Sequence, residues 1–269
     1  FRSGPPGSLA EPDSGALALP PRPARASTAA QILGAEILGA EGLSLRYDGP
    51  GGDTVLAAAG IELCAGELAV VTGPTGGGKS SLLALLAGLA PAYTGGEVTG
   101  TVSIAGHAVP AAELRPARMA GTVALVPQRV EHSFLSETVR AELAFAPARR
   151  GLSGAVLAEE VEEALERFRL VPLAERDPVS LSAGEATRVA LAAACLVHPR
   201  VLLLDEPIAD LDPDSAAVLL DSLRSLLAEG CAALVAEHRP EPLRALIGKV
   251  PIRWFEMREG RLAESAGEP

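Results

Sequence analysis

A glycine-rich stretch that directly follows an apolar run restricts the fold of this chain more than any other feature. Residues 73–80 read GPTGGGKS and fit the pattern G-x-x-x-x-G-K-[ST], and the apolar residues 68–71 before them have the length of a buried strand. Residues 79–89 are rich in Leu and Ala and lack Pro, which is typical of a helix. Because a strand, this turn and a helix form the context in which such a loop binds phosphate, the sequence predicts a nucleotide-binding α/β domain.

Residue types along this loop match the needs of a bound phosphate. Glycines let backbone N–H groups turn inward around phosphate oxygens, since side chains would restrict the dihedrals and block a close approach. The following helix start adds its positive dipole end, Lys79 would neutralise the β- and γ-phosphates, and the Ser80 hydroxyl would ligate magnesium. The alternative, a chance Lys-Ser after a glycine-rich turn, does not explain the flanking strand and helix. The predicted binding residues are Gly73, Pro74, Thr75, Gly76, Gly77, Gly78, Lys79, Ser80 and Ser81.

Two carboxylates follow a second apolar run of strand length, residues 201–204. Asp205 and Glu206 stand at its carboxyl end, and the ligands of open α/β sheets gather at that edge. Asp205 would hold the metal through its water ligands, and Glu206 would orient an attacking water or accept its proton. An apolar run followed by Asp-Glu is a weak signal alone, but together with the phosphate-binding loop it predicts a metal-dependent hydrolytic site.

The sequence LSAGE at residues 181–185 indicates a second helix start that binds an anion. Ser182 is a favourable N-cap, and Gly184 leaves backbone amides exposed at the beginning of an apolar helix. An ordinary capped helix that enters the core is the alternative. The position of LSAGE shortly before the Asp-Glu strand favours the anion-binding interpretation.

Six motifs in this order resemble the nucleotide-binding domain of an ABC transporter, over residues 37 to 262: GPTGGGKS, VPQ at 126–128, LSAGE, VLLLDEP at 201–207, ADLD at 209–212 and EHR at 237–239. The resemblance implies an α/β fold: a P-loop NTPase (RecA-like) core with a parallel or mixed sheet, an antiparallel β edge and an inserted α-helical subdomain. It places the ATP-binding domain at residues 36–264 and the helical subdomain at about 129–182.

By this resemblance, two ATP molecules with Mg²⁺ lie between two such domains. Ser182 and Gly184 would contact the γ-phosphate of the ATP held by the opposite subunit, and His238 would be the switch histidine at that phosphate. Gln128 would sense magnesium and the transport partner. The implied catalytic set is Glu206, His238 and Gln128; the metal set is Ser80, Gln128 and Asp205; and the further ATP-binding residues are Tyr47, Ser182, Ala183, Gly184, Glu185 and Asp210.

Several of these residues also have a purely structural interpretation. Tyr47 follows alternating apolar residues and could be an ordinary sheet residue instead of a ring stacked on adenine. His238 could be a solvated histidine beside Glu237, and Gln128 a plain loop residue. The predicted strand at residues 122–126 aims Gln128 at the catalytic edge, and the position of His238 after the Asp-Glu strand favours the switch role.

The signature differs from the commonest family pattern at two positions. Ala183 stands where glycine is commonest, and Glu185 where glutamine is frequent. One extra methyl group is tolerated if residue 183 keeps a negative φ. We therefore expect activity to survive.

Longer stretches at residues 94–106, 127–147 and 181–194 resemble the ATPases of energy-coupling factor importers, which take up vitamins and transition-metal ions. The resemblance implies a second ATPase domain, which could be identical, a paralogue or fused to this one, and a transmembrane coupling subunit. It implies a peripheral location at the cytoplasmic face of the cell membrane. We expect residues 129–142 to receive that subunit, with Phe134 and Leu135 as exposed anchors, although both could be core residues.

Two other function classes share the nucleotide motifs. A soluble ABC ATPase that acts on nucleic acid or ribosomes would need basic arms or a long coiled coil, and the net charge of −11 opposes contact with phosphate backbones. A regulatory module that binds ATP without hydrolysis would not need Lys79, Asp205, Glu206 and His238 together.

Composition sets the remaining limits. Cys64, Cys195 and Cys231 are few and far apart, so we expect neither a disulfide framework nor a zinc site. Uncharged apolar stretches such as residues 189–197 fall short of the about 20 residues that cross a bilayer. Residues 1–35 are rich in Pro, Ala and Gly and predict a disordered linker without a secretory signal. The first residue, Phe1, suggests a processed chain or a piece of a tandem protein.

In the helical insert, Glu159, Glu160, Glu162 and Glu163 are expected on a solvated face.

Overall fold

The computed structural model describes residues 33–47, 52–209, 211–246 and 248–266. The predicted linker at residues 1–35 therefore lies outside the described residues, apart from 33–35, and Asp210 lies outside them too.

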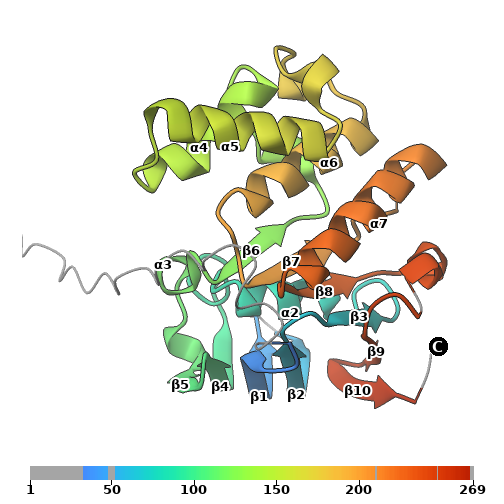
Figure 1. Cartoon of the computed structure of the whole chain (residues 1–269). Coiled ribbons are helices and arrows are strands. Elements are labelled where there is room, and N and C mark those ends of the chain that lie inside the picture. The colour runs from blue at the N-terminus through green and yellow to red at the C-terminus, as the bar shows by residue number, and fades with distance from the viewer. Residues whose placement is uncertain (1–32, 48–51, 210, 247, 267–269) are drawn as a thin grey trace, which may run out of the picture.

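Two β-sheets form the body of the domain (Figure 1). One has four antiparallel strands in the order β2-β1-β4-β5. The other has six strands in the order β10-β9-β3-β8-β7-β6, and all its pairs are parallel except β9 with β10. The strands of the first sheet are β1 (Glu36–Arg46), β2 (Thr54–Cys64), β4 (Glu97–Ile104) and β5 (His107–Pro110). Those of the second are β3 (Leu68–Thr72), β6 (Val123–Val126), β7 (Val201–Asp205), β8 (Ala232–Ala236), β9 (Ile252–Arg258) and β10 (Arg261–Ser265).

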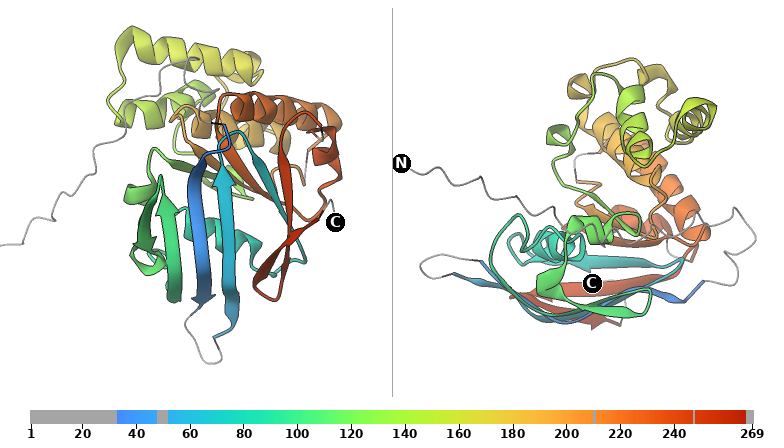
Figure 2. Two further views of the ribbon diagram at one scale, coloured as in Figure 1. Left: turned by 60° about the horizontal axis from the view of Figure 1, so that its bottom comes forward. Right: turned by 90° about the vertical axis from the view of Figure 1, so that its left-hand side faces the viewer.

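Burial explains why the central strands are almost purely apolar. Every residue of β3, β7 and β8 is buried, as expected for parallel strands that are covered on both faces. Along β3, Ala69 and Val71 face one core together with α2 (Lys79–Leu86) and the antiparallel sheet. Leu68 and Val70 face a second core. Helix α2 consequently lies between the two sheets (Figure 2).

The second core joins the parallel sheet to the helices on its other face. Helix α7 (Pro213–Ala228) contributes Leu219, Leu223 and Leu226 to this core. It begins at Pro213, because Asp212 caps it by accepting from the amides of Asp214 and Ser215. The remaining helices are α3 (Pro116–Met119), α4 (Val139–Arg149), α5 (Gly154–Arg167) and α6 (Ala183–Cys195), with short 3₁₀ turns at Ala111–Glu113, Val130–His132, Val171–Leu173, Pro178–Ser180 and Glu241–Leu246.

Helices α4 and α5 lie within residues 129–182, where a helical subdomain was predicted, and α6 follows directly after them; the three helices stand away from the antiparallel sheet (Figure 1). In α5, Val161, Ala164 and Leu165 are buried. The expectation that Glu160 lies on a solvated face is wrong. Its side chain is buried, and its carboxylate lies 3.6 Å from His198. Residue 160 lies three positions after Leu157 and four before Ala164, so helical periodicity places it on the same face of the helix as these two residues. Glu159 is exposed as predicted.

The fold class predicted from the sequence is confirmed, while several boundaries differ. Strand β6 begins at Val123, one residue after the expected start at 122, and strand β7 extends to Asp205, one residue beyond the expected apolar run. Helix α2 ends at Leu86 instead of residue 89; Gly88, just beyond it, has a φ of +74°, which is outside the helical range. Among the described residues, no helix is both long and apolar enough to cross a membrane.

Candidate nucleotide-binding and catalytic site

The predicted phosphate-binding loop connects the carboxyl end of β3 to the start of α2. Gly73, Gly76 and Gly78 have φ values of +143°, +78° and +106°. A Cβ on Gly73 would lie 2.3 Å from the carbonyl oxygen of Met257, and one on Gly78 would lie 2.5 Å from that of Val55. A Cβ on Gly76 would meet nothing within 4 Å. Packing of the chain therefore requires glycine at 73 and 78, whereas the backbone dihedral alone favours it at 76.

Lys79 is folded back over this loop. Its ammonium donates to the carbonyl oxygens of Gly73, at 2.8 Å, and Pro74, at 3.1 Å, and the residue is only 4% exposed. The N-cap of α2 is Gly78, which has no side chain to satisfy the first helical amides. A cation and free helix amides thus stand together in a concave loop, which is an anion-binding arrangement.

Asp205, which the sequence predicts to hold a metal ion, has a buried carboxylate. It is the last residue of β7 and is 9% exposed, and its Oδ1 atom has no hydrogen-bond partner among the described residues. Burial raises the pKa of this carboxyl, and a hydrogen bond from Ser80 opposes the shift. A buried, unpartnered carboxylate oxygen beside a serine hydroxyl is a donor set that suits Mg²⁺.

Glu206 and Gln128 meet where the neighbouring strands β7 and β6 end. Gln128 follows β6, and its side-chain amide donates to the Glu206 carboxylate at 2.8 Å. Glu206 has a φ of +50°, which is strained for a residue with a side chain. Its backbone amide donates to the carbonyl oxygen of Ala236 at 2.8 Å. The parallel sheet consequently brings Asp205, Glu206 and Gln128 to one edge, as the sequence predicted.

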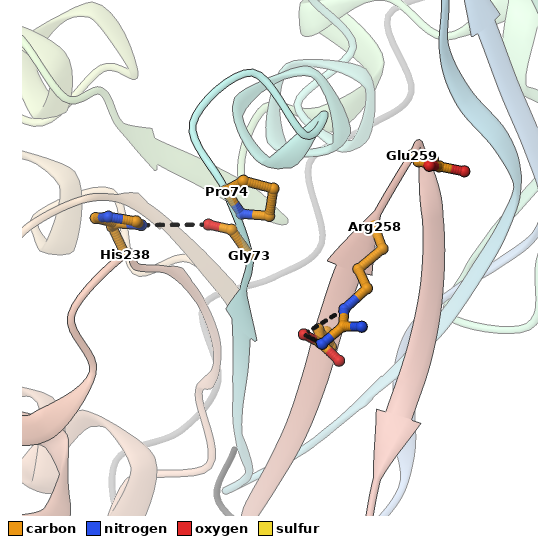
Figure 3. A pocket seen from close by; sticks show the side chains of 6 residues that line it. Gly73, Pro74, His238, Arg258 and Glu259 are labelled. Carbon is orange, nitrogen blue, oxygen red and sulfur yellow. Dashed lines mark hydrogen bonds and ion pairs between the residues drawn. The ribbon is translucent and has the colours of Figure 1, made fainter.

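His238 reaches the same edge from the end of β8. Its Nδ1 atom lies 3.4 Å from the carbonyl oxygen of Gly73 (Figure 3). A pocket of about 550 Å³ opens here, lined by Gly73, Pro74, His238, Glu256, Arg258 and Glu259. The last three residues belong to β9 and the turn after it, and Arg258 is paired with Glu256 at 2.6 Å. The sequence analysis did not predict these three lining residues, because their position depends on a strand pairing that no local pattern reveals.

Tyr47 lies where β1 ends and is half-buried. Its hydroxyl is 3.3 Å from that of Ser81, and its ring packs on the core shared by α2 and the antiparallel sheet. The structure thus brings Tyr47 to the helix that follows the phosphate-binding loop. Thr75 is exposed at the tip of the same loop.

The signature LSAGE forms the capped helix start that was predicted. The Ser182 hydroxyl accepts from the amide of Glu185 at 3.4 Å, and the Glu185 carboxylate accepts from the amide and hydroxyl of Ser182 at 2.9 and 3.0 Å. These hydrogen bonds, with Arg176 at 3.8 Å, lower the pKa of Glu185. Ser182 and Ala183 are exposed, and Ala183 is not among the described residues with positive φ, so its methyl group causes no backbone strain.

Gly184 has a structural requirement that the sequence analysis missed. A Cβ at this position would lie 2.7 Å from Oγ and 3.0 Å from Cβ of Ser215, and 3.4 Å from Oδ2 of Asp212. The Ser215 hydroxyl is fixed by a 2.6 Å hydrogen bond to the same Asp212 oxygen. The starts of α6 and α7 are therefore in close contact inside one chain.

Comparisons with known proteins show the family to which this chain is related. Residues 56–209 match the family model described as ABC transporter. A putative ABC transporter ATP-binding protein of Streptomyces avermitilis is 37% identical over 204 residues, which are 75% of this chain and 36% of that protein. The energy-coupling factor transporter ATP-binding protein EcfA2 of Symbiobacterium thermophilum is 34% identical over 198 residues, which are 73% of this chain and 66% of that protein.

A solved structure shows the same fold. The dimeric ATP-binding cassette MJ0796, in a post-hydrolysis state bound to ADP and Pi, aligns with a TM-score of 0.72 at 21% identity, over 86% of this chain and 100% of that chain. The chain spans little more than a third of the length of the first curated relatives, 36% in the Streptomyces avermitilis protein. Because the family model matches more than half of the residues, this chain belongs to the ABC transporter family.

Proposed function

We propose that this cassette binds ATP with Mg²⁺, hydrolyses it in sites shared with a second cassette, and thereby drives a transmembrane importer. The meeting of Lys79, Asp205, Glu206 and His238 at one sheet edge carries the proposal. Loop amides and Lys79 would bind the phosphates, and Ser80, Asp205 and Gln128 would hold the metal. When bound, Mg²⁺ would neutralise charge that develops on the phosphate oxygens.

Glu206 is proposed to orient the attacking water and accept its proton. The hydrogen bond from Gln128 fixes one carboxylate oxygen, which leaves the other available to water. Glu206→Gln should lower the turnover number for ATP by at least about 100-fold with ATP binding retained. Glu159→Gln, at an exposed carboxylate on α5, is the control. Unchanged turnover in E206Q would exclude Glu206 as the catalytic base.

The shared site is proposed because the signature begins a helix whose N-cap, Ser182, and first residue, Ala183, are exposed. Ser182 and Glu185 are hydrogen-bonded to each other, and Arg176 in the same subdomain lies beside them. Ser182 and Ala183 are nevertheless exposed at this capped helix start, so both are accessible to a second subunit. ATP with the E206Q variant should produce a stable dimer in analytical ultracentrifugation. Persistence of the monomer at every ATP concentration would argue against the shared site.

The importer partner is proposed to dock at residues 129–142. Leu135 is 72% exposed, whereas Phe134 is partly buried against the second core, so only Leu135 supports the expected role of an exposed anchor. The buried Glu142 carboxylate accepts from the amides of Leu135 and Ser136, both at 2.9 Å. This clamp holds the backbone so that Leu135 stays outside the core.

The docking proposal is tested by measuring how tightly variants of this chain bind an integral membrane subunit that copurifies with it. Leu135→Asp should weaken its binding about tenfold or more, because a charge would replace a buried apolar contact. Val156 on α5 is 53% exposed, and Val156→Asp should leave this binding unchanged. Equal binding by wild type and L135D would place the docking surface elsewhere.

The relation to EcfA2 supports an energy-coupling factor importer for a vitamin or metal ion, at the cytoplasmic face of the membrane.

A further inference from the structure

Glu237 is a buried carboxylate that contacts three segments at the catalytic edge. It follows the last residue of β8 and is 1% exposed. Its Oε1 atom accepts from the amide of Ile208 at 3.0 Å, and its Oε2 atom accepts from the amide of His238 at 3.2 Å. Its own amide donates to the carbonyl oxygen of Val71, on β3, at 2.9 Å. One side chain thus connects the loop after Glu206 to the loop that carries His238.

These contacts fix the backbone on both sides of the catalytic carboxylate. The amide of Glu206 is bonded to Ala236, and the amide of Ile208, two residues later, is bonded to Glu237. Residues 206 and 208 are therefore held by two consecutive residues of the neighbouring segment. Because Glu206 has a φ of +50°, it needs such external restraint to keep its orientation.

The same carboxylate also restrains the switch histidine. Oε2 fixes the backbone of His238, whose ring lies 3.4 Å from Gly73 in the phosphate-binding loop. The side chain of Glu237 has no contact of its own with that loop in the hydrogen bonds of the described residues. Any influence on the phosphate must therefore pass through Glu206 or His238.

We propose that Glu237 is a positioning residue for ATP hydrolysis: its two carboxylate oxygens set the backbones of Glu206 and His238 in their relative places. This inference rests on the proposed ATP hydrolysis. The amides of Ile208 and His238 bond to different oxygens of the side chain, and the amide of Arg239 also faces it, so both oxygens must be acceptors. Glutamine offers only one, and its NH₂ group would point at a second donor.

Steady-state ATP hydrolysis, with separate measurement of nucleotide affinity by a fluorescent ATP analogue, tests this role. Glu237→Gln should lower kcat by about 10- to 100-fold, as a small displacement of reacting groups does, with nucleotide affinity changed less than about threefold. Glu160→Gln, at a buried carboxylate on α5, is the matched control for the loss of a buried charge and should keep kcat.

A double variant identifies the route of the effect. If Glu237 acts through the switch histidine, the double variant of E237Q and H238A should hydrolyse ATP at a rate within about threefold of that of H238A alone. Fully multiplied losses would show that Glu237 does not act through His238. If E237Q does not fold, Glu237→Asp carries the test, since it keeps both acceptors but shortens the reach; its kcat should fall at least threefold at unchanged affinity.

Two different failures can be distinguished. No hydrolysis by the wild-type chain, alone or with its copurified partner, would overturn the proposed function. Normal hydrolysis by the wild type, with E237Q or a folded E237D retaining more than about half of its kcat, would overturn only the role of Glu237.

Discussion

The side-chain amide of Gln128 donates a 2.8 Å hydrogen bond to the carboxylate of Glu206. Gln128 stands where β6 leads into the helical subdomain, and Glu206 follows β7. This contact connects the catalytic carboxylate to the segment that is proposed to meet the membrane partner. A movement of that segment would therefore change the position of the carboxylate.

Removal of this contact should slow hydrolysis. Gln128→Ala should lower the turnover number by about 10-fold, because Glu206 loses the donor that orients it and the metal loses one oxygen ligand. Raising the Mg²⁺ concentration would restore activity only if metal binding alone were affected. Measurement of kcat against Mg²⁺ concentration separates the two losses, and an unchanged kcat in Q128A would show that the hydrogen bond has no catalytic role.

Gly184 should be intolerant of a side chain for reasons inside a single chain. Gly184→Ala would place a Cβ 2.7 Å from the Ser215 hydroxyl, and overpacking of this kind costs about 1–3 kcal/mol. Thermal unfolding should show a lower midpoint even without nucleotide. Ser215→Gly removes both opposing atoms and should reduce the loss in the double variant. Equal stability of G184A and wild type would contradict the close contact of α6 and α7.

Ala183 should behave differently from its neighbour. Ala183→Gly should change the rate of ATP hydrolysis less than about threefold, because Ala183 is already accommodated as the first residue of α6 without positive φ. Steady-state hydrolysis of the two proteins checks this. A hundredfold increase in A183G would mean that the natural signature is impaired.

Protonation of Glu237 should make stability depend on pH. Burial, opposed by backbone amides, raises the pKa of this carboxyl from 4.5 to about 7. The folded chain then binds more protons than the unfolded chain between these values, so this group's contribution to stability is present at low pH and is lost as the pH rises, by up to roughly 3 kcal/mol.

Chemical denaturation at pH 5 and pH 7.5 measures this effect. The wild type should lose more stability than E237Q over this interval, because glutamine does not titrate. Identical losses in the two proteins would show that the pKa of Glu237 is not raised in the folded state.

Local patterns predicted the part of the site that depends on neighbouring residues in the chain. A few consecutive residues were enough to predict each of three features: the glycines followed by Lys79, the apolar strand before Asp205, and the helix cap Ser182. The mixed sheet and its antiparallel β edge followed from the family resemblance. By contrast, β10 was missed because all of its residues are at least partly exposed and it has no apolar run.

Contacts between distant segments were beyond the sequence analysis. Glu160 was assigned to the solvated face because charge was given more weight than helical periodicity. The requirement at Gly184 comes from Ser215 on another helix, and the role of Glu237 comes from the amide of Ile208 across a strand pair. A charged residue directly after the apolar strand 232–236 was the only local hint of a buried carboxylate.

The rate of ATP hydrolysis per chain, measured over a wide range of chain concentrations together with the oligomeric state in ultracentrifugation, tests the shared site most directly. We expect the rate per chain to rise with concentration in parallel with the fraction of chains that are paired, since Ser182 of one subunit completes the site of the other. A constant rate per chain from a species that remains monomeric at every concentration would contradict the account.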